Sequence, residues 1–256
     1  MSLNGRDIIY RMAFSFGGIT QMLSSVLGGG NEASVIGIDI GASSAKIVQL
    51  RSRGGSAILE TYGEIALGPY GKQPVGKAVK LSPEKTAEAI MDLMKEANVT
   101  SRSGGISIPF SSSLISVLEF PKVDAETLKR MVPIEARKYI PIPVADVSLD
   151  WFVIPEDGAE KSAFDRVSGP PASAKSPVQE VLLVAIHNDT INAYQTIAGT
   201  AGLHVEFYEI EIFSSVRSSL SRGIAPVLVV DLGAATTKMY VVERGIIRTT
   251  HLITGG

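Results

Sequence analysis

The chain contains two copies of one short pattern, and this repeat constrains the fold more than any other feature. Residues 37–46 read Gly-Ile-Asp-Ile-Gly-Ala-Ser-Ser-Ala-Lys, and residues 229–238 read Val-Val-Asp-Leu-Gly-Ala-Ala-Thr-Thr-Lys. In each copy an apolar run ends in an aspartate, a turn of small residues follows, and a lysine opens a second apolar run. This order is typical of a β-hairpin with small residues at its tip. The sequence therefore predicts two matching hairpins far apart in the chain.

The residue types at the two tips indicate phosphate binding. Gly41 and Gly233 let the backbone turn with its N–H groups outward, and clustered N–H groups form an anion site. Asp39 and Asp231 would hold Mg²⁺ through water, because carboxylates and waters suit its octahedral coordination. Lys46 can reach a phosphate oxygen as a point charge. One Asp-x-Gly turn is a weak signal, but two copies that face each other can clamp a nucleoside triphosphate.

Composition excludes several classes of function. The chain has 24 Lys and Arg against 26 Asp and Glu, a net charge of −2, which disfavours nucleic acid as the main partner. It has no cysteine, which excludes disulfides, thiolate metal sites and cysteine nucleophiles. Its three histidines show no metal-binding spacing. No run approaches the ~18–20 apolar residues that a membrane-spanning helix requires.

The first 33 residues form a separate segment. Apolar residues recur at helical spacing over residues 6–27, with Arg6 and Arg11 among them and Gly17-Gly18 as a break. This amphipathic pattern fits a helix on a membrane surface, a helix that docks a partner, or a helix packed on its own domain. A secretory signal is disfavoured, because no cleavage site of small residues follows.

The remaining pattern is of the α/β class. Ser82-Pro83 predicts the start of a helix that runs to about Ala97 with Ala87, Ile90, Met91 and Met94 buried, and Asp124 caps a helix that contains Pro133. Residues 106–110 and 114–120 predict a strand pair, and residues 155–177 predict a mobile surface loop. Further strands are predicted at 35–39, 46–51, 57–67, 149–154, 181–186, 203–210, 227–231, 238–243 and 246–253, and further helices at 190–200 and 212–220.

Two lobes with one phosphate hairpin each resemble the actin, Hsp70 and sugar-kinase fold, which is ribonuclease H-like. Three longer motifs narrow the resemblance: Ile-Ser-Ile-Pro at 106–109, Leu-Glu-Phe-Pro at 118–121, and Glu-Ala-x-x-Tyr-Ile-Pro-x-Pro at 135–143 followed by Val-x-x-Asp at 147–150. They look like the PilM family of type IV pilus assembly proteins, relatives of the cell-division protein FtsA. The match runs from Val35 to the last residue.

The resemblance implies a division of the chain. Residues 34–104 and 187–224 correspond to actin-like subdomain IA, and residues 105–186 correspond to an inserted, FtsA-type 1C (SHS2-like) docking subdomain. Residues 225–256 correspond to the start of subdomain IIA, so we expect a second lobe that is truncated after Gly256, because family members continue beyond this point.

The resemblance also implies a function. We expect a cytoplasmic scaffold at the inner face of the bacterial inner membrane, involved in pilus biogenesis and twitching motility, that binds ATP and Mg²⁺ and is at most a weak ATPase. Its partner is the N-terminal peptide of a PilN-like membrane protein, together with other pilus motor and platform proteins. The peptide would add to an open strand edge where the inserted unit meets the first lobe. Membrane association would come through this partner or through residues 6–27.

Site residues follow from the matched motifs. The first phosphate loop contains Asp39, Gly41, Ser43, Ser44 and Lys46, and the opposing loop contains Asp231, Gly233, Thr236 and Thr237. Glu211 matches the position of a water-orienting glutamate in Hsp70-like ATPases, although a helix-start residue favoured by the dipole explains it equally well. Ala42 lacks the hydroxyl that many first loops have there.

Two other functions stay open for this superfold. An FtsA-like membrane-associated filament protein would need a membrane-targeting helix, for which residues 6–27 are the candidate. A small-molecule kinase would need a catalytic aspartate in a substrate pocket between the hairpins, and none is evident. Fold alone does not decide between such functions.

Overall fold

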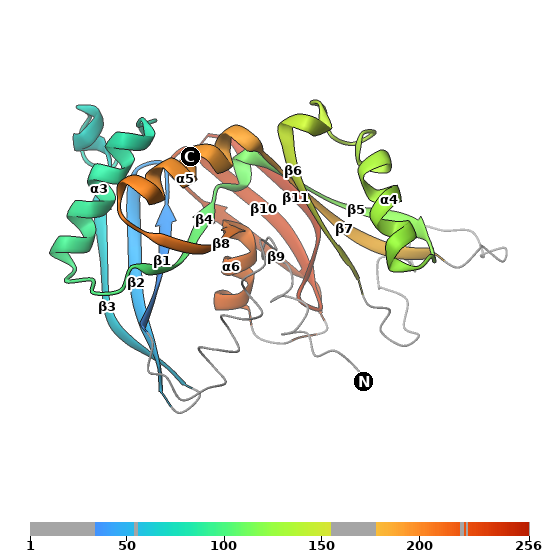
Figure 1. Ribbon diagram of the computed structural model, residues 1–256, viewed down its shortest axis with the longest axis horizontal. Helices are drawn as coiled ribbons and strands as arrows, with labels where there is room; N and C mark the ends of the chain where they lie inside the picture. Colours follow the sequence, from blue (N-terminus) through green and yellow to red (C-terminus); the bar gives the residue numbers. More distant parts are fainter. Residues whose placement is uncertain (1–33, 54–55, 155–177, 221–222, 224, 256) are drawn as a thin grey trace. The chain divides into compact units, whose positions relative to one another are not determined.

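The computed structural model describes residues 34–53, 56–154, 178–220, 223 and 225–255 (Figure 1). The predicted amphipathic segment 1–33, including residues 6–27, and the predicted loop 155–177 lie outside the described residues. The chain divides into two compact units. Of the described residues, the first unit contains those from Ser34 to Ser113 and those from Ile186 onward, and the second contains those between Leu114 and Ala185.

A five-stranded sheet forms the centre of the first unit. Strands β1 (Ser34–Ile40), β2 (Ser44–Arg53) and β3 (Ser56–Ala66) make the predicted antiparallel meander. Strands β4 (Ser103–Ile108) and β8 (His204–Ile210) continue the sheet parallel to β1, in the order β3-β2-β1-β4-β8. Alternation along β1 and β2 buries Ile36, Ile38, Ala45 and Ile47 on one face.

Two helices, α3 (Pro83–Glu96) and α5 (Asn188–Thr200), pack against each other beside this sheet (Figure 1). Helix α3 begins as predicted, because the Ser82 hydroxyl accepts a hydrogen bond from the Lys85 N–H and Pro83 occupies its first turn. The prediction that Met91 is buried is wrong, since it is 42% exposed. Leu93 is buried instead, on the same helical face as Thr86 and Ala89.

Strand β4 lies between β1 and β8, so the predicted pairing of residues 106–110 with 114–120 is wrong. Two glycines explain its position. A Cβ atom on Gly104 would lie 1.9 Å from the Ile36 carbonyl oxygen, and one on Gly105 would lie 2.3 Å from the Phe207 ring. Gly104 therefore lets the backbone of β1 approach closely, and Gly105 leaves room for the Phe207 ring of β8. The first residues of the inserted unit predicted for 105–186 therefore lie in the sheet of the first unit.

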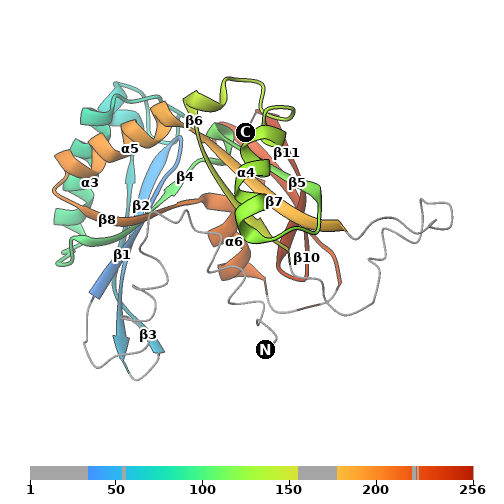
Figure 2. The ribbon, with the colours of Figure 1, turned by 45° about the vertical axis from the view of Figure 1, so that its right-hand side comes forward.

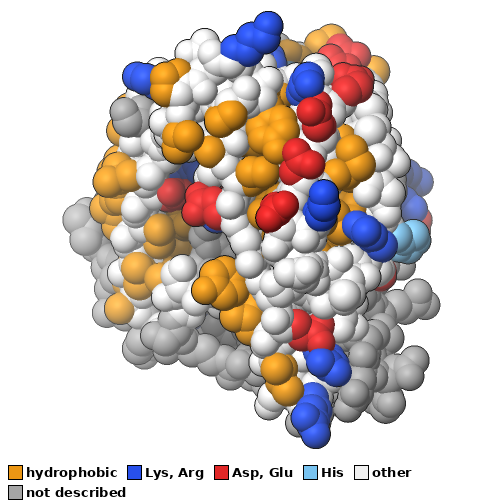
Figure 3. Space-filling model, turned by 90° about the vertical axis from the view of Figure 1, so that its left-hand side faces the viewer, with side chains coloured by type: hydrophobic (Ala, Val, Ile, Leu, Met, Phe, Trp, Pro, Cys, Tyr) orange, Lys and Arg blue, Asp and Glu red, His pale blue; other side chains and the backbone are white. Residues whose placement is uncertain are grey.

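The outer face of the first unit is charged. Helix α3 exposes Glu84, Glu88, Asp92 and Glu96 at four-residue spacing, and acidic side chains gather over this helix in Figure 3. Like charges at this spacing destabilise a helix by a few tenths of a kcal/mol per pair. Lys85, 2.6 Å from Glu88, and the Tyr70 hydroxyl, 2.6 Å from Asp92, offset part of this repulsion.

A second, three-stranded sheet completes the first unit. It contains β9 (Val227–Leu232), β10 (Thr236–Glu243) and β11 (Ile246–Thr254) in the order β11-β10-β9, all antiparallel, which confirms the second predicted meander. Arg244 and Gly245 have positive φ at the β10–β11 turn, as a tight two-residue hairpin requires. Helix α6 (Glu211–Ser219) follows β8 directly and packs on β8 and β4.

The second unit has its own core. Its sheet contains β5 (Ser113–Pro121), β6 (Val147–Val153) and β7 (Val178–His187) in the order β5-β7-β6. Helix α4 (Ala125–Ala136) packs on this sheet (Figure 2), and its Asp124 cap accepts a hydrogen bond from the Thr127 N–H, as predicted. Pro133 lies inside this helix. The buried core consists of Leu118, Phe120, Leu128, Val132, Ala136, Ile140, Val147, Val181, Leu183 and Ala185.

In the described part of the chain, three short 3₁₀ helices connect these elements: Gly68–Gly71, Phe110–Ser112 and Val144–Asp146. The second of them, η2 (Phe110–Ser112), follows β4 and ends where the chain enters the second unit. Among the described residues, no helix is long and apolar enough to cross a membrane.

The glycines of β4 give a prediction on stability. Gly104→Ala should lower the free energy of unfolding by about 1–3 kcal/mol, because backbone must move to admit the Cβ atom. Gly199→Ala, in helix α5 with no atom within 4 Å of the added Cβ, is the matched control and should be neutral or stabilising by up to ~1 kcal/mol. Urea denaturation measures both, and equal stability of the two variants would contradict this account of β4.

Candidate functional site

The sequence repeat is also a structural repeat. In the β1–β2 hairpin Asp39 lies opposite Lys46, and in the β9–β10 hairpin Asp231 lies opposite Lys238. The Gly41 N–H donates to the Ser44 carbonyl at 2.9 Å, and the Gly233 N–H donates to the Thr236 carbonyl at 3.0 Å. Each hairpin therefore closes with the same register, the same cross-strand Asp–Lys pair and the same turn hydrogen bond.

The glycines of the two turns act differently from the prediction. Their own N–H groups donate across the turn, so these two groups are not available to an anion, and the predicted outward N–H groups of the turns would have to come from the residues that follow the glycines. A Cβ atom would lie 3.1 Å from the Ser44 carbonyl oxygen at Gly41 and 2.9 Å from the Thr236 carbonyl oxygen at Gly233. A side chain at either glycine would therefore press on this carbonyl, which glycine avoids at each tip.

Both hairpins line one cavity of 1550 Å³ within the first unit. This volume exceeds the ~300–1,000 Å³ of typical small-ligand pockets, so the cavity has room for a nucleotide. Thr237 does not line it, and its hydroxyl donates to the Gly255 carbonyl at 3.2 Å. The other predicted residues all line the cavity: Asp39, Gly41, Ser43, Ser44, Lys46, Glu211, Asp231, Gly233 and Thr236.

The segment that follows β3 supports the first turn from behind. The Leu67 N–H donates to the Ser43 carbonyl and the Val79 N–H donates to the Ala42 carbonyl, each at 2.9 Å. Two carbonyl groups of the turn thus accept hydrogen bonds from elsewhere in the protein. The turn is held in position before any ligand binds.

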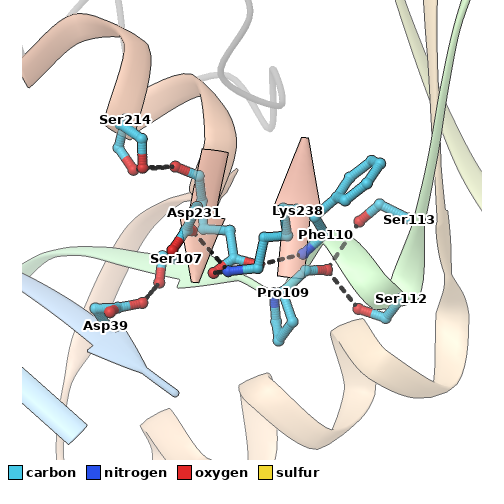
Figure 4. Close-up of polar contacts among 11 residues, drawn as sticks. Asp39, Ser107, Pro109, Phe110, Ser112, Ser113, Ser214, Asp231 and Lys238 are labelled. Carbon is cyan, nitrogen blue, oxygen red and sulfur yellow. Dashed lines mark hydrogen bonds and ion pairs between the residues drawn. The ribbon is translucent and has the colours of Figure 1, made fainter. Parts of the chain in front are cut away.

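The first hairpin presents an exposed cation. The Lys46 side chain is 53% exposed and lies 3.6 Å from Glu64 and 3.3 Å from the Ser44 hydroxyl. The hydrogen bond from Ser44 and the charge of Lys46 lower the pKa of Glu64. Such exposed ion pairs contribute little to stability, so Lys46 can turn to an anion at small cost. Asp39 accepts a hydrogen bond from the Ser107 hydroxyl of β4 at 2.5 Å, which orients its carboxylate (Figure 4).

The second hairpin presents a buried cation. Lys238 is only 8% exposed, and its Nζ lies 2.7 Å from Glu211 Oε2 and 3.0 Å from Asp231 Oδ2. Figure 4 shows the contact of Lys238 with Asp231. Burial opposes the charged form of Lys238, but the hydrogen bonds and negative charges of the two carboxylates outweigh it and raise its pKa. The ammonium therefore stays charged beside the cavity.

Glu211 joins three elements. It is the first residue of α6, and its Oε1 accepts the N–H of Phe110 in η2 at 2.7 Å while its Oε2 accepts from Lys238 of β10. Its backbone carbonyl accepts the hydroxyls of Ser214 and Ser215 at 2.8 and 3.0 Å. Both carboxylate oxygens of the predicted water-orienting residue are thus engaged within the protein.

Two tyrosines line the cavity and are buried, Tyr194 on α5 and Tyr240 on β10. Burial, followed by the negative charges of Asp39 and Glu211, raises the pKa of Tyr194. Its hydroxyl is therefore protonated at neutral pH. Neither tyrosine was singled out from the sequence, because a single aromatic residue in a strand or helix pattern predicts core packing.

The described residues contain no group of three or more His, Cys, Asp or Glu side chains placed to hold a metal ion. Asp39 and Asp231 line the same cavity, as do Glu64, Asp189 and Glu211, and these two are the carboxylates that the paired hairpins contribute. Two carboxylates with waters and ligand phosphates are the usual environment of Mg²⁺, which keeps much of its hydration shell.

Comparisons with known proteins agree with this geometry. Residues 37–249 match the family model of the type IV pilus assembly protein PilM. The chain is similar to a solved structure of a "PilM-PilN type IV pilus biogenesis complex", with a TM-score of 0.65 and 20% identity over 88% of this chain. It spans 62% of the length of that chain.

A second similar structure is the cytoplasmic domain of EpsL, an inner-membrane component of the type II secretion system of Vibrio cholerae. Its TM-score is 0.50 and its identity 13%, over 87% of this chain and 71% of that chain. These likenesses support the actin-like fold predicted from the paired hairpins. Since the family model covers most of the chain, the protein belongs to the family of the type IV pilus assembly protein PilM.

Proposed function

We propose that this member of the family is a cytoplasmic, ATP-binding scaffold of type IV pilus assembly that docks the N-terminal peptide of a PilN-like inner-membrane protein. One observation carries the nucleotide part of the proposal: two hairpins with the same register and the same Asp–Lys pair line a single cavity. Membership of the PilM family supports the pilus part.

The residues of the cavity fit a polyphosphate with a magnesium ion. Lys46 is an exposed cation on one side, and the hydroxyls of Ser43, Ser44 and Thr236 are short donors at the two turns. Asp39 and Asp231 would hold Mg²⁺ through its waters. The bound ion would neutralise phosphate charge, and the hairpins would grip the phosphates from both sides.

The contacts of the Glu211 carboxylate fit a protein that recognises a partner and hydrolyses ATP slowly. A general base must reach the attacking water with a free oxygen. Each oxygen of Glu211 already accepts one structural hydrogen bond, from the Phe110 N–H and from Lys238, so a water would have to use a remaining lone pair of a carboxylate that these contacts hold in place. We therefore propose weak ATPase activity at most.

The second unit is the proposed docking module. Its strands β5 and β6 are the two edges of its sheet, and an extended peptide can add main-chain hydrogen bonds to such an edge. The similar solved structure is of a PilM-PilN complex, which supports a partner of this kind. Such a partner, or residues 6–27, would hold the protein at the inner face of the inner membrane beside other pilus motor and platform proteins.

The phosphate role of the hairpins predicts the effect of a substitution. Asp39→Ala should weaken the binding of Mg²⁺-ATP at least tenfold, because the metal loses one of its two carboxylates. Isothermal titration calorimetry with ATP and excess Mg²⁺ measures this. Glu96→Ala, on the exposed surface of α3, is the control and should bind as the unchanged protein does. Equal affinity of the Asp39→Ala variant would contradict the assigned role.

The docking role predicts direct binding of a short peptide. A synthetic peptide with the cytoplasmic N-terminal sequence of the PilN-like protein from the same organism should bind saturably with one site, measured by calorimetry or fluorescence anisotropy. A scrambled peptide of the same composition controls for non-specific charge effects. A flat titration with the native peptide, from a sample that is folded by circular dichroism, would reject the docking function.

A further inference from the structure

We propose that Glu211 and Lys238 form a switch that transmits occupancy of the cavity to residues 109–113, the connection that leads into the second unit. This inference rests on the proposed function, because its ligand is the polyphosphate of the nucleotide. It assigns to Glu211 a positioning role, which differs from the predicted orientation of water.

Glu211 fixes the start of this connection. The Phe110 N–H donates to Glu211 Oε1 at 2.7 Å, and hydrogen bonds to a carboxylate are stronger than those to a neutral acceptor. The hydroxyls of Ser112 and Ser113 donate to the Pro109 carbonyl at 2.9 and 3.2 Å, so the rest of the segment folds back on its own first residue (Figure 4). The Glu211 carboxylate is therefore a side-chain anchor from another element onto residues 109–113.

Lys238 holds the other oxygen of the same carboxylate. Its ammonium lines the cavity, within 2.7 Å of Glu211 and 3.0 Å of Asp231. One oxygen of the Glu211 carboxylate thus accepts a hydrogen bond from Lys238 in the cavity, and the other accepts one from the Phe110 N–H in the connection. No further residue is needed to join the two contacts.

A polyphosphate would change this balance by electrostatics. Its negative charge attracts Lys238, and a Mg²⁺ ion would draw Asp231 away from that lysine. Glu211 would then share its cation with the ligand and face a like charge at close range. The carboxylate would turn from the cavity, and its hydrogen bond to the Phe110 N–H would lengthen.

Such a coupling is reciprocal. A ligand of the second unit that stabilises one state of residues 109–113 must change the affinity for nucleotide by some factor. Nucleotide must then change the affinity for that ligand by the same factor. Docking of a partner and occupancy of the cavity would then regulate each other through one carboxylate.

Hydrogen–deuterium exchange over residues 109–113 tests the switch. In the unchanged protein, saturating Mg²⁺-ATP should speed exchange of this segment by at least about fivefold, the lower end of typical coupling. Glu211→Gln should speed it without nucleotide, because a neutral amide is a weaker acceptor, and should remove the response to nucleotide. Lys238→Met should also remove the response, and it serves as the second variant if Glu211→Gln folds poorly.

Lys85→Met is the matched control, because it removes a lysine from an ion pair of similar length on α3. It should keep both the basal exchange and the response. Unchanged exchange in Glu211→Gln without nucleotide overturns the anchor. If calorimetry shows that Mg²⁺-ATP binds and exchange at residues 109–113 stays the same, the switch is wrong while the proposed function stands. If Mg²⁺-ATP does not bind, both are wrong.

Discussion

The buried ammonium of Lys238 is the interaction on which the architecture of the cavity depends. It bonds to Asp231 at the end of β9 and to Glu211 at the start of α6, and Glu211 in turn holds the Phe110 N–H. A charge this far from water is costly unless it is paired and hydrogen-bonded. Both carboxylates meet that need, and Glu211 is the closer and the more buried of the two, so its removal would leave Lys238 with the weaker partner.

The two hairpins share one backbone design but differ in electrostatics. Lys46 is half exposed and has a weak surface pair with Glu64, whereas Lys238 is buried between two acids. The first tip is therefore ready to meet an anion, and the second tip is organised by contacts within the protein. A repeated sequence has produced two halves of a cavity with different tasks.

Local signals predicted the parts of the fold that local physics determines. The paired hairpin motifs predicted both meanders, and Ser82-Pro83 and Asp124 predicted two helix starts. The pairing of strands was harder to predict from the sequence. Residues 106–108 form a strand as predicted, but an apolar run does not indicate which other strand it pairs with. Gly104-Gly105 was the available signal, because two adjacent glycines in a strand indicate close backbone approach.

The polar network of the site could not be predicted from the sequence, because its members lie far apart in the chain. Glu211 and Lys238 lie 27 residues apart on a helix and a strand, and no periodicity connects them. The second lysine of the repeat was visible in the sequence, yet its pairing depends on Glu211 at the start of α6, which only the folded chain brings beside it. The Phe110 contact is made by a backbone N–H, which no side-chain pattern can reveal.

A crystal structure with Mg²⁺ and a non-hydrolysable ATP analogue tests the central claim most directly. The account predicts the triphosphate between the Gly41–Ser44 and Gly233–Thr236 turns, with the metal ion near Asp39 and Asp231. An analogue bound elsewhere, or touching one hairpin while the other stays remote, would contradict it.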